Sequence, residues 1–220
     1  MPEAPIIQCA LDYVSLPEAM AMAYRVQGAV EALEIGTPLC KAEGMRAVSA
    51  IHALCPDKII LADVKTPDVG GLEAKIAFDA GANWMTVMGA APLDTLKLAL
   101  EEAEGRPGHE VIVELTGIKD VLAEAAIWRD VGVERMVYHR GWDEGNLSRT
   151  WDSSDRQAIE ALIDMGFKLS IAGGIDLETL PFFEGLRIAV FVIGRAIRET
   201  PDPEQTARRF RTRIDEIWVG

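Results

Sequence analysis

Residues 58–68 read KIILADVKTPD, a short apolar run that ends in a cluster of charged residues. The run from Ile59 to Ala62 shows no alternation of polar and apolar positions. That pattern is typical of a strand covered on both faces, as in a parallel sheet flanked by helices. Asp63, Lys65 and Asp68 follow directly. The segment therefore predicts a buried parallel strand with ionisable residues at its carboxyl end.

The same pattern, an apolar run followed by a helical stretch, recurs along the whole chain. We predict strands at Ile6–Asp12, Ala32–Gly36, Lys58–Asp63, Trp84–Met88, Glu110–Glu114, Arg135–His139, Lys168–Ala172 and Ile188–Ile193. The stretches between them are rich in Ala, Leu, Glu and Lys, with apolar residues three and four apart, as an amphipathic helix requires. Eight such units of about 27 residues each predict a single-domain (β/α)8 TIM barrel over residues 1–220. A doubly wound sheet is the alternative, since repeats alone do not prove closure.

Composition narrows the classes of partner. The 220 residues are 49% hydrophobic and 26% charged, which is ordinary for a globular domain, and carry 35 acidic against 22 basic residues, a net charge of −13. Basic residues are outnumbered by acidic ones, so we expect neither a nucleic acid nor an anionic membrane surface as a partner. No apolar run is long enough to span a bilayer. The acidic N-terminus lacks signal-peptide features, and Cys9, Cys40 and Cys55 read as buried free thiols, so a cytoplasmic location is expected.

Ionisable residues stand at the expected ends of many strands. They are Asp12, Glu34, Asp63, Lys65, Glu114 and His139. Isolated buried charges cost several kcal/mol unless they are paired or bound to a metal, so packing does not explain them. In a (β/α)8 barrel the chemistry lies at the carboxyl ends of the strands. We interpret the set as an active site.

The Asp63-x-Lys65-x-x-Asp68 segment is the most informative part of that set. Asp63 and Lys65 are two positions apart on an extended segment, so both side chains can enter one cavity. A cation among carboxylates keeps them ionised and can stabilise a developing oxyanion. The alternative is structural: a salt bridge, with Asp68 capping the following helix.

Glu34 and Asp63 are candidate ligands for a hard cation. Carboxylates without a nearby Cys or His pattern favour Mg²⁺, which binds oxygen ligands and retains water. Two carboxylates would leave positions open for a chelating substrate. The alternative is that Glu34 pairs with Lys65 and no metal binds.

The ends of the last two predicted strands carry a possible phosphate site. They read AGGI from Ala172 and VIGRAI from Val192, and glycines such as Gly174 and Gly194 let backbone N–H groups approach a phosphate. Arg195 can donate two hydrogen bonds to it. Phosphate sites after strands seven and eight are frequent in these barrels.

His139 is the candidate for proton transfer. It follows a strand, and a histidine titrates near neutrality, which suits a general acid or base. A histidine with a purely structural role is the alternative.

The chain resembles the orotidine 5′-phosphate decarboxylase suprafamily. Within it, the chain is similar to the branch of 3-keto-L-gulonate 6-phosphate decarboxylase and 3-hexulose-6-phosphate synthase. The resemblance runs over nearly the whole sequence, through the motifs QCALD, EIGTPL, ADVKTPD, WMTVMGA, VELTG, VYHR, DMGFK, AGGI and FVIGRAIR.

The resemblance implies a homodimer with Asp68 entering the partner's active site. It also implies that Glu34 and Asp63 hold Mg²⁺, and that Asp12 and Lys65 line the reacting end of a phosphorylated keto-sugar. The implied phosphate and substrate contacts are Ala172, Gly174, Gly194 and Arg195. Glu114 and His139 match positions that orient the substrate and deliver a proton.

The implied chemistry agrees with the residue types. A β-keto acid loses CO2 only if the electrons left behind are stabilised. Chelation by Mg²⁺, with Lys65 nearby, would stabilise a 1,2-enediolate, and a proton relayed by His139 would give L-xylulose 5-phosphate. The synthase adds the same enediolate to formaldehyde.

Motif details separate the two reactions. Glu114 and the YHR around His139 resemble the decarboxylase, whereas Ala172 resembles the synthase. Trp142 stands where the decarboxylase carries an arginine, and tryptophan cannot supply a guanidinium hydrogen bond. We expect the decarboxylase, with the synthase as the alternative. A non-catalytic sugar-phosphate binding protein is the alternative from another class.

Overall fold

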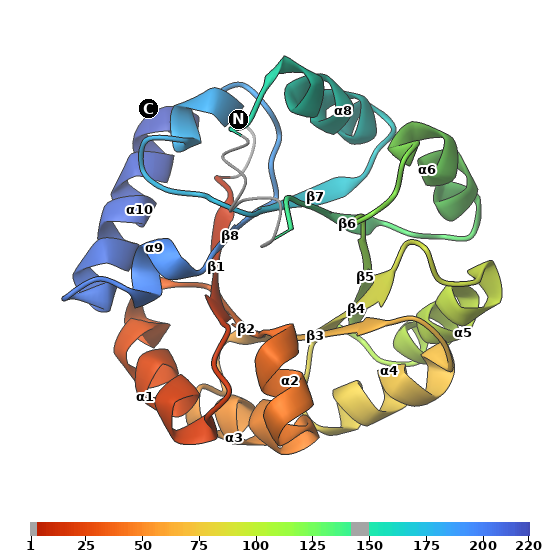
Figure 1. Cartoon of the computed structure of the whole chain (residues 1–220), viewed down its shortest axis with the longest axis horizontal. Helices are drawn as coiled ribbons and strands as arrows, with labels where there is room; N and C mark the ends of the chain where they lie inside the picture. The colour runs from red at the N-terminus through yellow and green to blue at the C-terminus, as the bar shows by residue number, and fades with distance from the viewer. Residues whose placement is uncertain (1–3, 142–149) are drawn as a thin grey trace.

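Eight parallel strands close into a barrel in the computed structural model, which describes residues 4–141 and 150–220 (Figure 1). The strands are β1 (Ile6–Leu11), β2 (Ala32–Ile35), β3 (Ile59–Thr66), β4 (Trp84–Met88), β5 (Glu110–Glu114), β6 (Arg135–His139), β7 (Lys168–Ala172) and β8 (Val190–Ile193). Each strand pairs with its neighbour in chain order, and β8 returns to β1 through pairs such as Val190 with Ile6. This closure confirms the predicted (β/α)8 barrel and rules out the doubly wound sheet, which has open edges.

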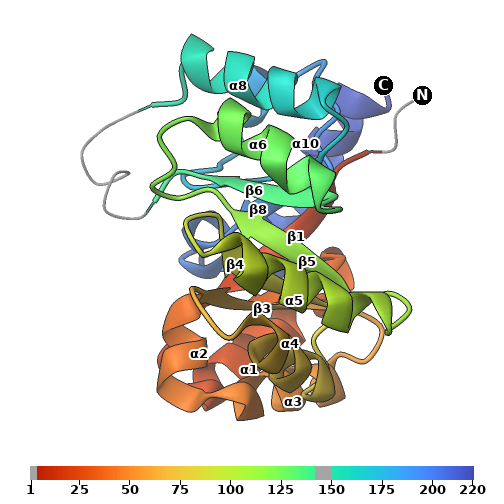
Figure 2. The same ribbon diagram turned by 90° about the vertical axis from the view of Figure 1, so that its right-hand side faces the viewer.

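Helices surround the barrel and connect successive strands (Figure 1). The α-helices are α1 (Leu16–Val26), α2 (Thr37–Glu43), α3 (Met45–Leu54), α4 (Gly70–Asp79), α5 (Leu93–Glu104), α6 (Val121–Asp130), α8 (Ser153–Asp164), α9 (Arg195–Arg198) and α10 (Pro203–Trp218), with 3-10 turns η1 (Gln27–Ala29) and η2 (Leu180–Phe183). Figure 2 shows α4, α5, α6 and α8 side by side along one flank. Within the described ranges, no helix is both long and apolar enough to cross a membrane.

Packing follows the apolar pattern of the sequence. Helix α10 illustrates this, because Phe210, Ile214 and Trp218 recur every four residues, lie on one face and are buried. The Trp218 ring lies 5.4 Å from that of Phe191 on β8, and its indole N–H donates to the Leu186 carbonyl at 2.9 Å. Burying each large side chain stabilises the fold by about 1.5–3 kcal/mol. The barrel interior holds a separate apolar layer that includes Leu61 and Ile112.

Two local departures from a regular barrel affect the site. Strand β3 continues past the predicted end at Asp63 to Thr66, and its pairing with β4 shifts register between Ala62 and Thr66. After β7 the connection forms the 3-10 turn η2, where an eight-fold repeat would place an α-helix. Pro181 within that turn and Gly185 after it, at φ 82°, disfavour a longer helix.

Candidate active site

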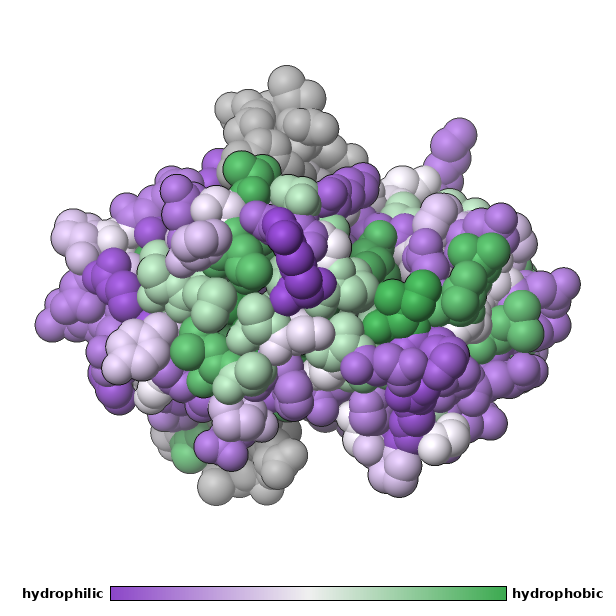
Figure 3. Space-filling view, turned by 90° about the horizontal axis from the view of Figure 1, so that it is seen from below, coloured by the Kyte–Doolittle hydropathy of each residue, from purple (hydrophilic) through white to green (hydrophobic). Residues whose placement is uncertain are grey.

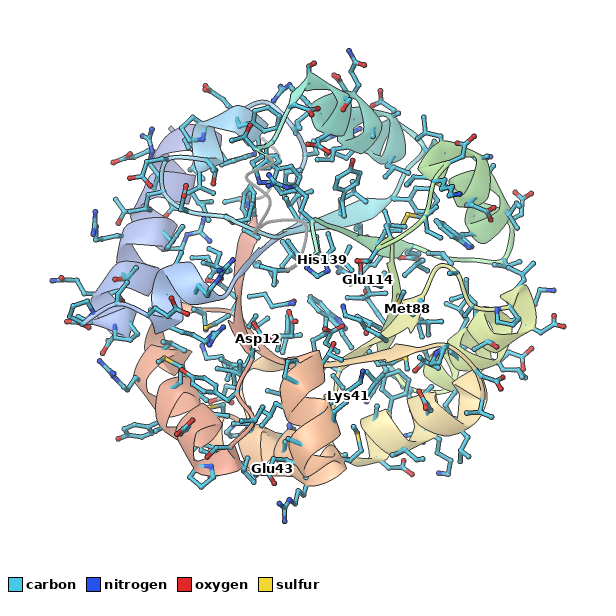
Figure 4. All side chains as sticks on the ribbon, in the orientation of Figure 1. Asp12, Lys41, Glu43, Met88, Glu114 and His139 are labelled. Carbon is cyan, nitrogen blue, oxygen red and sulfur yellow. The ribbon has the colours of Figure 1, made fainter. Side chains whose placement is uncertain are left out.

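A cavity of about 940 Å³ opens at the carboxyl ends of the strands. It is lined by all of the residues predicted for the site except Asp68: Asp12, Glu34, Asp63, Lys65, Glu114, His139, Ala172, Gly174, Gly194 and Arg195. Figure 4 shows Asp12, which follows β1, across the mouth of the barrel from Glu114 on β5 and His139 on β6. The residues meet because parallel strands bring their carboxyl ends to one edge.

Lys65 occupies the irregular part of β3 and has a left-handed backbone conformation, with φ 51°. Such a conformation costs on the order of 1–3 kcal/mol for a residue with a side chain. The backbone N–H of Lys65 donates to Thr86 Oγ1 at 2.9 Å, which helps to hold it. The side chain then reaches two carboxylates, with Nζ 3.1 Å from Asp63 and 2.5 Å from Glu114. Burial alone would lower the pKa of Lys65, but Asp63 and Glu114 outweigh it and raise that pKa, so the amine stays charged.

Asp63 is buried among hydroxyl groups as well as beside Lys65. Thr37 Oγ1 donates to its Oδ2 at 2.6 Å, and Thr86 Oγ1 donates to its Oδ1 at 2.8 Å. These bonds fix the carboxylate in one orientation toward the cavity, as a ligand or a charge-stabilising group requires.

Glu34 lies beside Asp63 and receives a hydrogen bond from Gln8 Nε2 at 2.6 Å. Burial, followed by the charges of Asp63 and Asp12, raises the pKa of Glu34 well above its usual range. Burial likewise raises the pKa of Asp12, and Arg198, whose Nη2 lies 3.2 Å from Asp12 Oδ2, only partly opposes this. Burial and the neighbouring carboxylates therefore both disfavour the ionised forms of Glu34 and Asp12.

Glu114 links Lys65 to His139. Its side chain is 1% exposed, and Oε2 contacts both Lys65 Nζ and, at 3.0 Å, His139 Nδ1. Thr116 Oγ1 donates to the other oxygen, Oε1, at 2.7 Å. Burial would raise the pKa of Glu114, but the hydrogen bond from His139 and the charge of Lys65 lower it to about 2. Because Nδ1 of His139 faces this carboxylate, Nε2 is the nitrogen left to exchange a proton.

The turn after β7 forms the opposite side of the cavity. Gly173 and Gly174 have φ values of 98° and 67°, which side chains rarely adopt. A Cβ atom on Gly173 would lie 2.2 Å from the Arg140 carbonyl oxygen, whereas the space at Gly174 is open. Backbone groups can thus approach a ligand closely here, and Gly194 and Arg195 line the same part of the cavity.

Asp68 is the predicted site residue that this cavity does not include. Its side chain is exposed, and its Oδ1 accepts a hydrogen bond from the Val69 N–H at 2.8 Å, one residue before α4 begins. Trp142, on which the comparison of the two reactions partly depended, lies outside the described residues.

Two structural alternatives were considered for these charged residues: a salt bridge within the Asp63–Asp68 segment, and pairing of Glu34 with Lys65. The salt bridge between Lys65 and Asp63 exists. Among the described residues Lys65 does not pair with Glu34, because its amine is directed to Asp63 and Glu114 and Glu34 is bonded to Gln8.

Several supporting residues were not predicted individually. They are Gln8, Thr37, Thr86, Thr116 and Arg198. Each stands inside a motif used above, such as EIGT, WMTV or VELTG, so the signal was present. A threonine in a strand or turn gives no indication by itself of which carboxylate it contacts.

A model of the orotidine 5′-phosphate decarboxylase / HUMPS family matches residues 5–210. The chain belongs to this family. It is 41% identical over 214 residues to 3-keto-L-gulonate-6-phosphate decarboxylase UlaD from Escherichia coli, covering 97% of this chain and 98% of that protein. The predicted membership is therefore confirmed.

Solved structures agree with the sequence comparison. KGPDC from Streptococcus mutans in complex with D-R5P superposes with a TM-score of 0.95 at 36% identity, over 98% of this chain and all of that one. A 3-hexulose-6-phosphate synthase superposes with a TM-score of 0.88, also at 36% identity, over 94% of this chain and 99% of that one. Both kinds of enzyme named by the resemblance are thus structural neighbours of this member of the family.

Proposed function

We propose that this enzyme decarboxylates 3-keto-L-gulonate 6-phosphate to L-xylulose 5-phosphate and CO2. Relatives at 41% identity over nearly the full chain are named for that reaction, which makes a carboxy-lyase the first choice. The observation that carries the proposal is the buried Glu114, which contacts both a cation, Lys65, and a candidate proton donor, His139. Decarboxylation of a β-keto acid needs both: positive charge for the electrons left behind, and a proton to replace CO2.

The residues divide that chemistry between them. When the bond to the carboxylate carbon breaks, its electron pair passes to the neighbouring carbonyl oxygen and gives an enediolate. Lys65, fixed between Asp63 and Glu114, supplies a preorganised positive charge for that oxygen. His139 then returns one proton to the carbon that lost CO2, and its contact with Glu114 keeps the ring oriented for transfer from Nε2. Gly174, Gly194 and Arg195 bind the phosphate, which holds the other end of the sugar.

Mg²⁺ belongs to the proposal as the cofactor, with Glu34 and Asp63 as its ligands. The donor set fits, because both are buried carboxylates, and the raised pKa of Glu34 reflects burial and negative charge that a cation would relieve. The described residues contain no group of three or more His, Cys, Asp or Glu that could hold a metal. A cation held by Glu34 and Asp63 alone would leave positions for water and substrate oxygens. Bound there, the cation would supply charge to the substrate oxygens on which negative charge develops.

A homodimer in which Asp68 enters the partner's cavity is also part of the proposal. Asp68 is exposed and does not line its own cavity. Directly after it, Val69 is 53% exposed just before α4 begins, Leu72 and Ile76 on α4 are 59% and 46% exposed, and Leu98 on α5 is 51% exposed. Hydrophobic surface gathers over α4 and α5 on the right-hand side of Figure 3. An apolar surface of this kind beside an unused acidic residue supports association with a second copy.

The synthase reaction is the second candidate. Ala172 supports it, as does the synthase structure at 36% identity. A paired assay separates the candidates: release of CO2 from 3-keto-L-gulonate 6-phosphate, and consumption of formaldehyde with D-ribulose 5-phosphate, each with Mg²⁺ and again with EDTA. We expect rapid decarboxylation, slower aldol addition, and loss of both in EDTA. The reverse ranking would assign the enzyme to the synthase reaction.

A binding protein without activity predicts a different result. Lys65→Ala should retain most ligand affinity in the enzyme, because phosphate contacts remain, but lose turnover. Absence of turnover by the wild-type protein on either substrate would favour the binding protein.

A further inference from the structure

Gln8 is a buried polar residue in the barrel interior that the reaction described above does not use. It is on β1, is 2% exposed and lines the floor of the cavity. Leu61, Ile112 and Val137 in the same floor are apolar, and Ser170 is another buried polar residue there, so the fold itself does not require an amide at this level. A buried amide in an apolar layer costs free energy unless its groups are bonded, which points to a role for the contact that it makes.

That contact is with Glu34. Gln8 Nε2 donates to Glu34 Oε2 at 2.6 Å, and both side chains are buried, so the bond is short and assisted by the carboxylate charge. It occupies Oε2 and leaves Oε1 of the carboxylate available. No other described side chain donates a hydrogen bond to Glu34, so Gln8 determines how its carboxylate is turned.

The oxygen of the Gln8 amide, Oε1, indicates that Glu34 sets the orientation of the amide group. A carboxylate oxygen accepts a hydrogen bond, so the NH2 group of Gln8 must face it. Gln8 Oε1 then points away, and it is buried with no hydrogen-bond partner among the described residues. The side chain thus leaves its own oxygen unsatisfied while it holds the carboxylate.

We propose that Gln8 is a positioning residue that holds the Glu34 carboxylate from below, so that Oε1 is directed to the divalent cation. The inference rests on the cation site of the proposed function. Hydrogen bonds to a ligating group orient it, and their removal typically lowers metal affinity by about 10–100-fold.

The test measures cation binding without substrate. Wild-type enzyme is stripped with EDTA and titrated with Mn²⁺, which prefers the same oxygen ligands and is detected by calorimetry and by electron paramagnetic resonance. Gln8→Met keeps the length of the side chain and removes the hydrogen bond. Ser170→Ala is the matched control, because Ser170 is equally buried in the same floor, its Oγ has no partner among the described residues, and it does not contact Glu34.

We expect Gln8→Met to raise the Kd for Mn²⁺ by about 10-fold or more, and Ser170→Ala to change it by less than about 2-fold. Thermal melting checks that the variants are folded. If Gln8→Met does not fold, Gln8→Asn, whose shorter amide cannot reach Glu34, is measured in its place with the same expectation. A folded variant that binds Mn²⁺ as tightly as the wild type would overturn the inference.

The outcome is separable from that of the proposed function. If the wild type binds Mn²⁺, loses affinity on Gln8→Met, and releases no CO2 from the proposed substrate, the positioning role stands and the substrate assignment fails. If the wild type decarboxylates the substrate but binds no Mn²⁺, the positioning role and the cation site fail while the decarboxylase stands.

Discussion

Glu114 is a single residue whose ionisation should be visible in the stability of the whole protein. Its pKa is about 2 in the fold against an ordinary value of 4.5. Because the pKa is lower in the folded state, the ionised Glu114 carboxylate stabilises the fold fully above about pH 4.5. This stabilisation is lost as the pH falls toward 2. The shift corresponds to something on the order of 3 kcal/mol. We therefore predict that Glu114→Gln flattens the dependence of unfolding free energy on pH between about 4.5 and 2.5, measured by urea denaturation.

Glu134→Gln provides the control for that measurement. Glu134 also pairs with a lysine, Lys168, at 2.9 Å, but its side chain is 72% exposed, so the pair should contribute little. Its pH profile should follow the wild type. Parallel profiles for wild type and Glu114→Gln would show that Glu114 titrates normally in the fold.

For Lys65, the sequence predicted the place of the residue in the site but not its backbone conformation. Its place in the site followed from the charged cluster after an apolar run. Its left-handed conformation, φ 51°, did not, because lysine carries no preference for that region. The conformation depends on Thr86, which bonds the Lys65 N–H and is 21 positions away in the sequence. Gln8 was missed for a similar reason. Its hydrogen-bond partner, Glu34, lies on the neighbouring strand β2, and the sequence alone does not say which side chains of two paired strands meet.

Strands and helices were the most predictable elements. Every strand was expected within three residues of its observed ends, since continuous apolar runs follow the two covered faces of a parallel sheet. The extension of β3 to Thr66 was missed because the charged residues after Ala62 indicated an end. The short η2 turn was missed because the eight-fold repeat suggested an α-helix there.

The turn after β7 allows a prediction about an element. Gly173 and Gly132 have similar φ values, 98° and 92°, but only Gly173 lines the cavity and abuts the Arg140 carbonyl. Alanine at either position should destabilise the fold by about 1 kcal/mol or more through backbone strain. Gly173→Ala should also displace the turn and raise KM for the phosphorylated substrate by about 10-fold, because the proposed phosphate contacts follow it.

Steady-state kinetics and thermal melting of the two variants test this. Gly132→Ala should lower Tm and leave KM unchanged. Equal effects of both variants on KM would mean that the β7 turn does not contact the substrate.

At the scale of the whole molecule, the cavity of a single chain lacks Asp68, the last acidic residue of the Asp63-x-Lys65-x-x-Asp68 segment. Asp68 follows Lys65 by three positions, yet it is exposed and does not line the cavity that Lys65 enters. In a two-fold dimer each cavity would combine Lys65 of one protomer with Asp68 of the other. Lys65→Ala and Asp68→Ala should then each abolish most activity. A heterodimer of the two variants would contain one cavity with both residues intact and one with neither.

Co-expression of the two variants tests this arrangement directly. Random pairing makes half of the dimers mixed, with one of two cavities intact, so the preparation should recover about a quarter of wild-type activity. Co-expression of Lys65→Ala with Lys65→Ala, or of Asp68→Ala with itself, should recover none. If Asp68 served its own chain, each protomer would still carry one lesion in its own cavity, and the mixture would be as inactive as its parents. Recovery therefore distinguishes a shared site from a complete one within each barrel.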